Sequence, residues 1–169
     1  PKTKRDMALL TESLKNWIGE EVSYEAPEDL GHASIRYFAI ALEDDNPLYR
    51  NDTYAKAAGY PGIVASPTLI CESCQYADNK PNSDGYAGHV WDLPISNCRL
   101  IRVGNGYEFF RPILPTDRIS VKWKLESIQE RSFSKGGTQL FVESVARYFD
   151  REGELLATNR ETLVYQPLI

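Results

Sequence analysis

The stretch ISVKWKLE, residues 119–126, decides the fold of this chain. Its apolar residues Ile119, Val121, Trp123 and Leu125 alternate with polar and charged ones. Successive side chains of a β-strand point to opposite faces of the sheet, so this period of two predicts a strand with one buried face. A sheet that buries one face needs a second layer of structure to cover it.

The same alternation continues on both sides of this stretch, from residue 95 onward. Turn signals interrupt it at Asn105-Gly106, Gly136-Gly137 and Glu152-Gly153. The runs between these signals predict a long antiparallel meander. Its strands are expected at residues 97–103, 107–113, 118–130, 138–149 and 154–166.

The first half of the chain has helical periodicity instead. Apolar residues three or four positions apart predict helices at residues 7–18 and 30–43. A third, short helix is expected at residues 51–58, with Asn51 or Asp52 as N-cap and Gly59 as stop. A short alternating run at residues 21–26 predicts a strand between the first two helices. The order of elements is therefore helices first and a sheet afterwards, which is typical of the α+β class.

A further helix at residues 67–77 is expected to cover the sheet. Ser66 followed by Pro67 is a favourable helix start, and the mostly apolar residues after it predict burial. Residues 78–92 are rich in Asn, Asp, Gly and Pro and are predicted to form an exposed loop. A sheet wrapped around one central helix is the hot-dog arrangement, so we predict an α+β hot-dog fold in a single domain, residues 1–169.

Composition excludes several classes of function. The chain has 169 residues, a net charge of −5 and 25% charged residues, which suits one globular domain and disfavours a nucleic-acid binder. No run approaches the roughly 18 apolar residues of a membrane span. The first residues do not resemble a signal peptide, so the expected location is the cytoplasm.

The cysteines and histidines do not indicate a metal or a cofactor. Cys71 and Cys74 have the spacing of a redox motif, but they lie on the predicted buried helix and no second cysteine pair or nearby His completes a zinc site. Of the two histidines, His32 and His89, the second stands beside Trp91 in the predicted loop and is expected at the surface.

The stretch DDNPLYR, residues 44–50, is the most specific in the chain. On composition alone it is an acidic loop with an Asn-Pro turn signal. It also resembles the signature of the MaoC-like, R-specific enoyl-CoA hydratases, which runs Asp, any residue, Asn, Pro, aliphatic, His. The stretches GIVA (62–65), YEFFRPI (107–113) and PTDR (115–118) are similar to the same family. The resemblance is closest to the MaoC-like N-terminal dehydratase domain, which often forms one half of a double hot-dog.

The resemblance implies roles for the motif residues. Asp44 matches the family's acid/base Asp, and Asn46 matches the Asn that helps to position it. The family's His falls on Tyr49, and an unperturbed Tyr, with a pKa near 10, is a poor base at neutral pH. The cation of Arg50 would keep Asp44 ionised if the two groups are close.

A second departure concerns the thioester oxygen. In active members a His-Gly pair opens the central helix, and the Gly N–H faces the thioester carbonyl. Counting without gaps from Asp44 places that pair at Ser66-Pro67, and Pro has no N–H to donate. If the comparison is shifted by one residue, Ser66 instead matches the family's Gly. With Arg50, these two residues and Thr68 are the predicted substrate-binding positions.

The two departures favour a non-catalytic half of an acyl-thioester hydratase/dehydratase. The resemblance implies a coenzyme A or acyl-carrier thioester as ligand, and either a homodimer or a heteromer with a catalytic MaoC-like subunit. One alternative is a self-sufficient enoyl-CoA hydratase that uses Asp44. Another is a protein that binds acyl thioesters without turnover. A thioesterase would rest on fold analogy alone.

Overall fold

The computed structural model describes residues 8–135 and 137–168, and its main element is one antiparallel sheet. The five strands lie in the order β1-β3-β4-β5-β2. Their bounds are Glu21–Glu25 for β1, Cys98–Phe109 for β2, Ser120–Phe133 for β3, Gly137–Phe149 for β4 and Leu155–Pro167 for β5. The predicted α+β hot-dog fold is confirmed.

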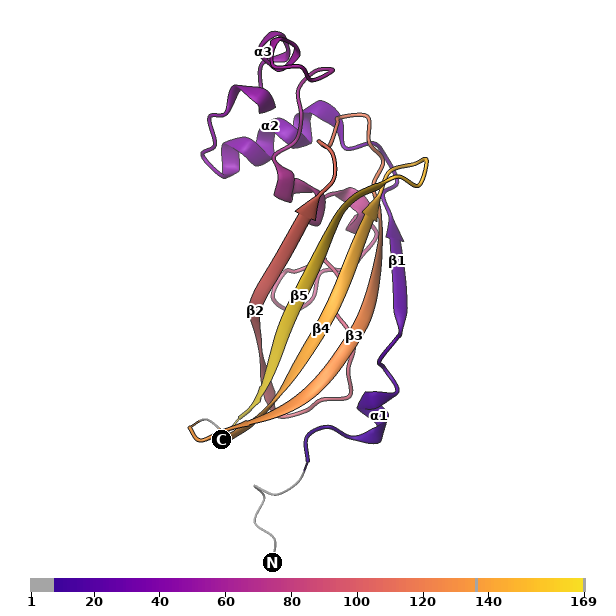
Figure 1. The fold of residues 1–169 in the computed structure, drawn as a ribbon, viewed down its shortest axis with the longest axis vertical. Coiled ribbons are helices and arrows are strands. Elements are labelled where there is room, and N and C mark those ends of the chain that lie inside the picture. Colours follow the sequence, from indigo (N-terminus) through magenta and orange to yellow (C-terminus); the bar gives the residue numbers. More distant parts are fainter. Residues whose placement is uncertain (1–7, 136, 169) are drawn as a thin grey trace, which may run out of the picture.

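The helices gather mainly at one end of the sheet (Figure 1). The α-helices are α1 (Glu12–Lys15), α2 (Gly31–Ala41) and α3 (Asp52–Ala57), and the 3₁₀-helices are η1 (Pro47–Tyr49), η2 (Pro67–Glu72) and η3 (Cys74–Tyr76). Helix α1 is shorter than the predicted helix at residues 7–18, since it begins only after its N-cap Thr11; Met7 lies outside the described residues. In the described part of the chain, no helix has the length and apolarity needed to cross a membrane.

The alternating stretch forms the start of β3, between β1 and β4, and buries one face as predicted. The side chains of Ile119, Val121, Trp123 and Leu125 are buried on one face. A register shift after Leu125 inserts one extra residue into β3, so that Ile128 rather than Ser127 continues the buried face. The bulge therefore keeps the apolar residues of a long strand on a single side.

The prediction of a turn at Asn105-Gly106 is wrong. Strand β2 runs without interruption from Cys98 to Phe109 and pairs with β5 along its length. The register shifts between Arg102 and Gly104, so Val103 is the extra residue of a bulge beside the glycine. A long neighbouring strand supplies a continuous ladder of hydrogen bonds, which outweighs the local turn preference. The signal at Gly153 is correct, because this residue has a φ of +85° in the turn between β4 and β5.

The predicted central helix at residues 67–77 is broken into η2 and η3. Ser73 separates them with an extended backbone, ψ −176°. Its Oγ donates a hydrogen bond to the backbone oxygen of Ile70 at 3.0 Å, and Nε2 of Gln75 donates to the same oxygen at 2.7 Å. Two side chains thus occupy a carbonyl that a continuous helix would use, which explains the break. The predicted burial of Leu69 and Ile70 is confirmed.

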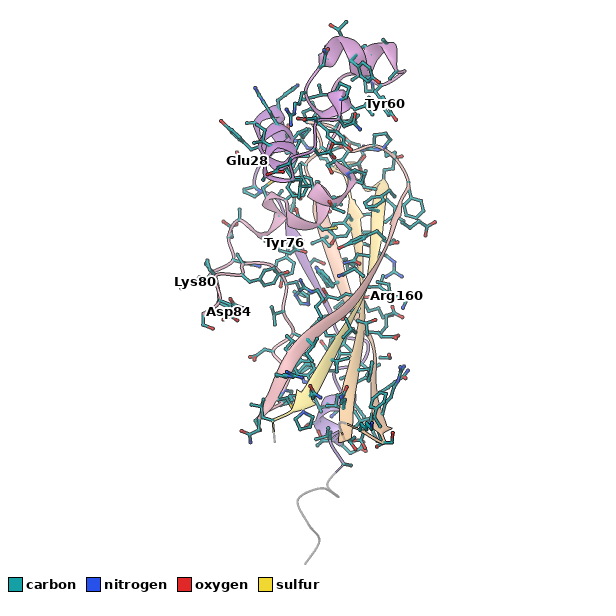
Figure 2. All side chains as sticks on the ribbon, turned by 90° about the vertical axis from the view of Figure 1, so that its left-hand side faces the viewer. Glu28, Tyr60, Tyr76, Lys80, Asp84 and Arg160 are labelled. Carbon is teal, nitrogen blue, oxygen red and sulfur yellow. The ribbon has the colours of Figure 1, made fainter. Side chains whose placement is uncertain are left out.

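The segment after η3, residues 77–97, completes the cover of the sheet without regular secondary structure. Lys80 and Asp84 lie at an outer bend of this segment, away from the strands (Figure 2). The expectation of an exposed loop at residues 78–92 fails at its end, because Trp91 is buried in the core. Leu93, just beyond these bounds, is buried as well. We call the side of the sheet that this segment contacts the covered face.

His89 is also buried, which contradicts its expected surface position. It is 6% exposed. Its ring centroid lies 4.3 Å from that of Trp91 and 4.9 Å from that of Trp123. Its Nδ1 shares a hydrogen bond of 2.9 Å with the hydroxyl of Tyr24. The rings of Tyr24, Trp91 and Trp123 thus pack around the His89 imidazole, in the region that a central helix was expected to fill.

Candidate functional site

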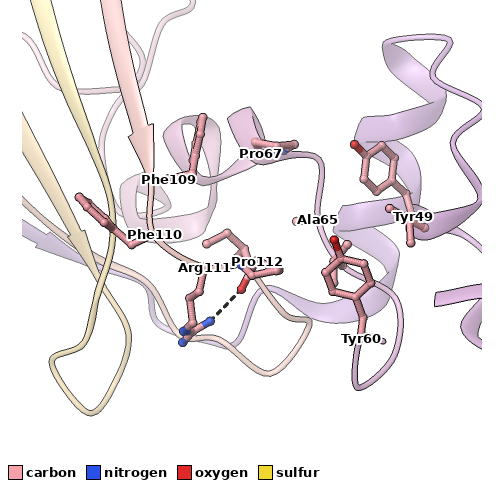
Figure 3. Close-up of a pocket in the computed structure, with 11 residues that line it drawn as sticks. Tyr49, Tyr60, Ala65, Pro67, Phe109, Phe110, Arg111 and Pro112 are labelled. Atoms are coloured by element: carbon pink, nitrogen blue, oxygen red, sulfur yellow. Dashed lines mark hydrogen bonds between the residues drawn. The ribbon is translucent and has the colours of Figure 1, made fainter. Parts of the chain in front are cut away.

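A cleft of about 330 Å³ opens where the helices meet the end of β2. Tyr49 and Tyr60 lie on one side of it, and Phe109 and Phe110 lie on the other (Figure 3). Most of its lining is apolar or aromatic. The full lining is Leu48, Tyr49, Tyr60, Val64, Ala65, Pro67, Phe109, Phe110, Arg111, Pro112 and Ile113.

The carboxylate of Asp44 is held inside its own loop. Glu43, which follows α2, has a φ of +54° and reverses the chain there. Asp44 Oδ1 then accepts a hydrogen bond of 3.0 Å from the backbone N–H of Asn46. Arg50 donates to the backbone oxygen of Asp44 at 2.8 Å, while its ion pair, at 3.1 Å, is with Asp45. Asp44 is not among the residues that line the cleft.

Asn46 begins the short helix that carries Tyr49. Its Oδ1 accepts a hydrogen bond of 3.0 Å from the N–H of Leu48, and Pro47 occupies the first position of η1. Such a cap fixes the first turn of the helix. Tyr49 is 8% exposed and lines the cleft. The motif therefore places Tyr49 at the cleft.

The segment at the start of η2 offers few backbone donors to the cleft. Pro67 lines it and has no N–H. The N–H groups of Val64 and Ala65 donate instead to the backbone oxygens of Leu48 at 3.1 Å and Ile113 at 2.8 Å. Ser66 is buried beside Pro67, whereas Thr68 is exposed and does not line the cleft.

Arg111 is the charged residue of the cleft lining, and sequence reasoning gave it no role. It donates to Asp117 and Asp150, each at 2.9 Å, and to Glu154 at 3.1 Å. Hydrogen bonding to Asp117, and then to Asp150, raises the pKa of its guanidinium above the ordinary value, against the effect of burial. The three carboxylates engage the N–H groups of the Arg111 guanidinium. Arg111 thereby links the end of β2 to the segment before β3 and to the turn between β4 and β5.

The cleft lining presents few groups that could transfer a proton. The residues that line the cleft include no His, Asp, Glu or Lys. General acid/base catalysis requires a titratable group within hydrogen-bond reach of the reacting atoms, and the hydroxyls of Tyr49 and Tyr60 are the candidates in this lining. Among the described residues, no group of three or more His, Cys, Asp or Glu side chains could hold a metal ion.

The fold is that of the hot-dog class of proteins, and the family match places the chain among its dehydratases. Residues 16–159 match the family model described as FAS1-like, dehydratase domain region, so the chain belongs to this family. A UPF0336 protein of Mycobacterium tuberculosis is 30% identical over 155 residues, which cover 90% of this chain and 86% of the relative. A probable enoyl-CoA hydratase alpha subunit of Thermomonospora curvata is 26% identical over 160 residues, 89% of this chain and 50% of the relative.

Solved structures agree with this assignment at the level of the fold. A chain of the ChsH1-ChsH2 complex from Mycobacterium tuberculosis is similar with a TM-score of 0.72 and 20% identity, covering 88% of this chain and 84% of that one. A MaoC-like dehydratase from Rhodospirillum rubrum has a TM-score of 0.64 and 16% identity, covering 94% and 99%. The resemblance to MaoC-like proteins is thereby confirmed.

Proposed function

We propose that this chain is the non-catalytic subunit of an acyl-thioester hydratase/dehydratase and supports a catalytic partner. The observation that carries the proposal is the position of Tyr49 in the cleft, where the family motif has its His. Tyr can donate a hydrogen bond at neutral pH but is a poor base there. The substrate class, an enoyl or 3-hydroxyacyl thioester of coenzyme A or a carrier protein, follows from the family.

The second support is that Pro67, at the position counted as the family's Gly, has no N–H to offer the thioester oxygen. Hydration of an enoyl thioester develops negative charge on that oxygen, and removal of one donor slows such reactions by about 10²–10³. Pro67 cannot donate, and Val64 and Ala65 donate within the protein. If the alignment shifts by one residue, Ser66 takes the donor position, so a test of Pro67 also tests the alignment.

The lining of the cleft suits the role of holding substrate. Ligand pockets are commonly about 300–1,000 Å³ and lined by apolar and aromatic side chains. The volume of about 330 Å³ lies at the lower end of that range. Phe109 and Phe110 belong to the end of the edge strand, so a ligand in the cleft would lie close to whatever pairs with that edge.

The partner would join the sheet at β2. This strand lies at one end of the strand order, so one of its edges has no neighbour in the described chain. It is 12 residues long and carries the exposed apolar side chains Leu100, Val103, Tyr107 and Phe109. A long, apolar edge strand promotes association, which two sheets joined edge to edge would satisfy. Either a second copy of this chain or a separate catalytic chain could pair with β2 in this way.

The Thermomonospora relative and the ChsH1-ChsH2 complex make a heteromer the favoured form. The first is named a subunit and the second is a complex of two proteins. A self-sufficient hydratase remains the second candidate, because Asp44 and Asn46 are both present. The backbone N–H of Asn46 donates a hydrogen bond to the Asp44 carboxylate.

Hydration of crotonyl-CoA and of a longer enoyl-CoA tests the proposal. Loss of the conjugated thioester absorbance would be followed with the chain alone and with a candidate partner from a neighbouring gene. We expect no turnover alone, and turnover in the mixture that survives Asp44→Asn in this chain. Turnover by the chain alone that Asp44→Asn abolishes would overturn the proposal in favour of a working Asp44. Binding of thioester without turnover in every pairing would favour the binding protein.

A further inference from the structure

A band of polar side chains crosses the covered face of the sheet, where apolar residues would be expected. Ser144 is 1%, Asn159 3% and Glu161 6% exposed. Glu161 of β5 lies opposite Ser144 of β4 and opposite Asn105 of β2, and Asn159 lies opposite Tyr107. The band therefore runs from the middle of the sheet to its β2 edge.

A small hollow of about 30 Å³ lies over this band. Such a volume accommodates about one water-sized group. Its lining includes Asn105, Asn159, Arg102 and Glu161, together with the aromatic rings of Tyr107 and Trp123. It is thus a polar hollow at the β2 edge of the covered face, separate from the apolar cleft at the end of β2.

The hydrogen bonds of the hollow leave one buried acceptor unused. Arg102 Nε contacts Glu161 Oε2 at 2.9 Å. Asn159 Nδ2 donates to Asn105 Oδ1 at 3.1 Å. Within the described part of the chain, however, Asn159 Oδ1 is buried with no hydrogen-bond partner. A buried acceptor without a donor destabilises the fold, so a leucine there would suit a purely structural role better.

The hollow and the cleft are neighbours along β2. Tyr107 lines the hollow and Phe109 lines the cleft. Their rings are stacked, with centroids 5.8 Å apart. From Phe109 to Asn105 the strand spans about 13 Å, at about 3.3 Å for each residue. Measured along β2, the polar band therefore lies about 13 Å from the cleft.

We propose that the hollow receives a hydroxyl group carried on the acyl part of the thioester whose head lies in the cleft. A hydroxyl is close to water in size, and its O–H would donate to Asn159 Oδ1. A plain hydrocarbon tail would instead leave that acceptor unpaired. The inference rests on the proposed function, since it assumes that the cleft holds an acyl thioester.

Isothermal titration of the full chain with two thioesters tests the inference. Both are enoyl-CoA molecules with a tail about 13 Å long, and only one carries a terminal hydroxyl. We expect the hydroxylated ligand to bind about tenfold more tightly, the effect of one buried hydrogen bond. Asn159→Leu should abolish the preference, and Asn159→Ala serves if the leucine variant does not fold. Thr158→Val, a polar-to-apolar change on the opposite face of β5, is the matched control and should keep it.

The outcomes separate this inference from the proposed function. Equal binding of both ligands, or a preference that survives in both Asn159 variants, would overturn the hydroxyl site and leave thioester binding intact. If neither ligand binds, the proposed function falls together with the inference.

Discussion

Trp91 donates a hydrogen bond from its indole Nε1 to the hydroxyl of Ser144 at 2.8 Å, and both residues are buried. The bond ties the irregular segment after η3 to the middle of β4. It is one of a small number of polar contacts by which this segment takes the place of a regular central helix.

Trp91→Phe is therefore expected to destabilise the protein. The phenyl ring keeps much of the packing but leaves the buried hydroxyl of Ser144 without its donor, an effect of about 1–3 kcal/mol. Urea unfolding of Trp91→Phe, Ser144→Ala and the double variant forms a double-mutant cycle. We expect a coupling free energy of about 1 kcal/mol, and a coupling near zero would show that the bond contributes nothing to stability.

His89 should make the stability depend on pH. Burial among aromatic rings lowers the pKa of its imidazole from 6.5 to about 4. The folded state therefore favours the neutral form, so this contribution is complete above pH 6.5 and is lost as the pH falls toward 4. A shift of this size corresponds to roughly 3 kcal/mol.

Urea unfolding between pH 7 and pH 4 would measure this effect. His89→Gln should flatten the pH dependence of the free energy of unfolding, whereas His32→Gln, at an exposed position of α2, should leave it unchanged. Parallel pH profiles for wild type and His89→Gln would contradict the assignment.

The Arg111 network supplies a third prediction. Arg111→Met leaves Asp117 and Asp150, both 8% exposed, without their cation. Loss of one partner from a buried ion pair typically destabilises a protein by about 3–5 kcal/mol. Chemical denaturation checks this, with Arg151→Met as the control, because Arg151 pairs with Asp29 at the surface and should matter little. Equal effects of the two substitutions would show that the network adds nothing beyond a surface pair.

The sequence was a good guide where one physical preference dominated. The alternation through Trp123 predicted β3 because burial on one face outweighs any local tendency there. At Asn105-Gly106 the local turn tendency competed with pairing to β5, and pairing over the whole strand prevailed. At Ser73 the reverse occurred, since the side chains of Ser73 and Gln75 interrupted a helix that the apolar pattern favoured.

The candidate site was only partly predictable for a similar reason. The motif located Tyr49, which lines the cleft, but also pointed to Asp44, which does not. The polar band was missed because β5 mixes polar and apolar residues on both faces, so its sequence does not show that Asn159 and Glu161 are buried. Contacts from distant segments, rather than any local signal, determine these positions.

The edge strand gives a fourth prediction. Val103 of β2 is 52% exposed, and Val103→Lys would place a charge on the edge where the partner is proposed to pair. Charged residues on an edge oppose strand pairing, so self-association or complex formation should weaken at least about tenfold. Sedimentation velocity checks this, with Ile18→Lys as the control at an exposed apolar site outside the sheet. Unchanged association in Val103→Lys would place the interface elsewhere.

The last prediction concerns the two departures from the family motif. If the chain is non-catalytic because it lacks both a general base and an oxyanion donor, then Tyr49→His alone should gain little hydration activity. Tyr49→His combined with Pro67→Gly should gain more, since a general base contributes about 10²–10⁴ in rate and an oxyanion donor about 10²–10³. Crotonyl-CoA hydration by both variants measures this, and Tyr49→Phe with Pro67→Gly is the matched control without a base. A large gain from Tyr49→His alone would mean that the protein already has an oxyanion donor, with Ser66 rather than Pro67 in the position of the family's Gly.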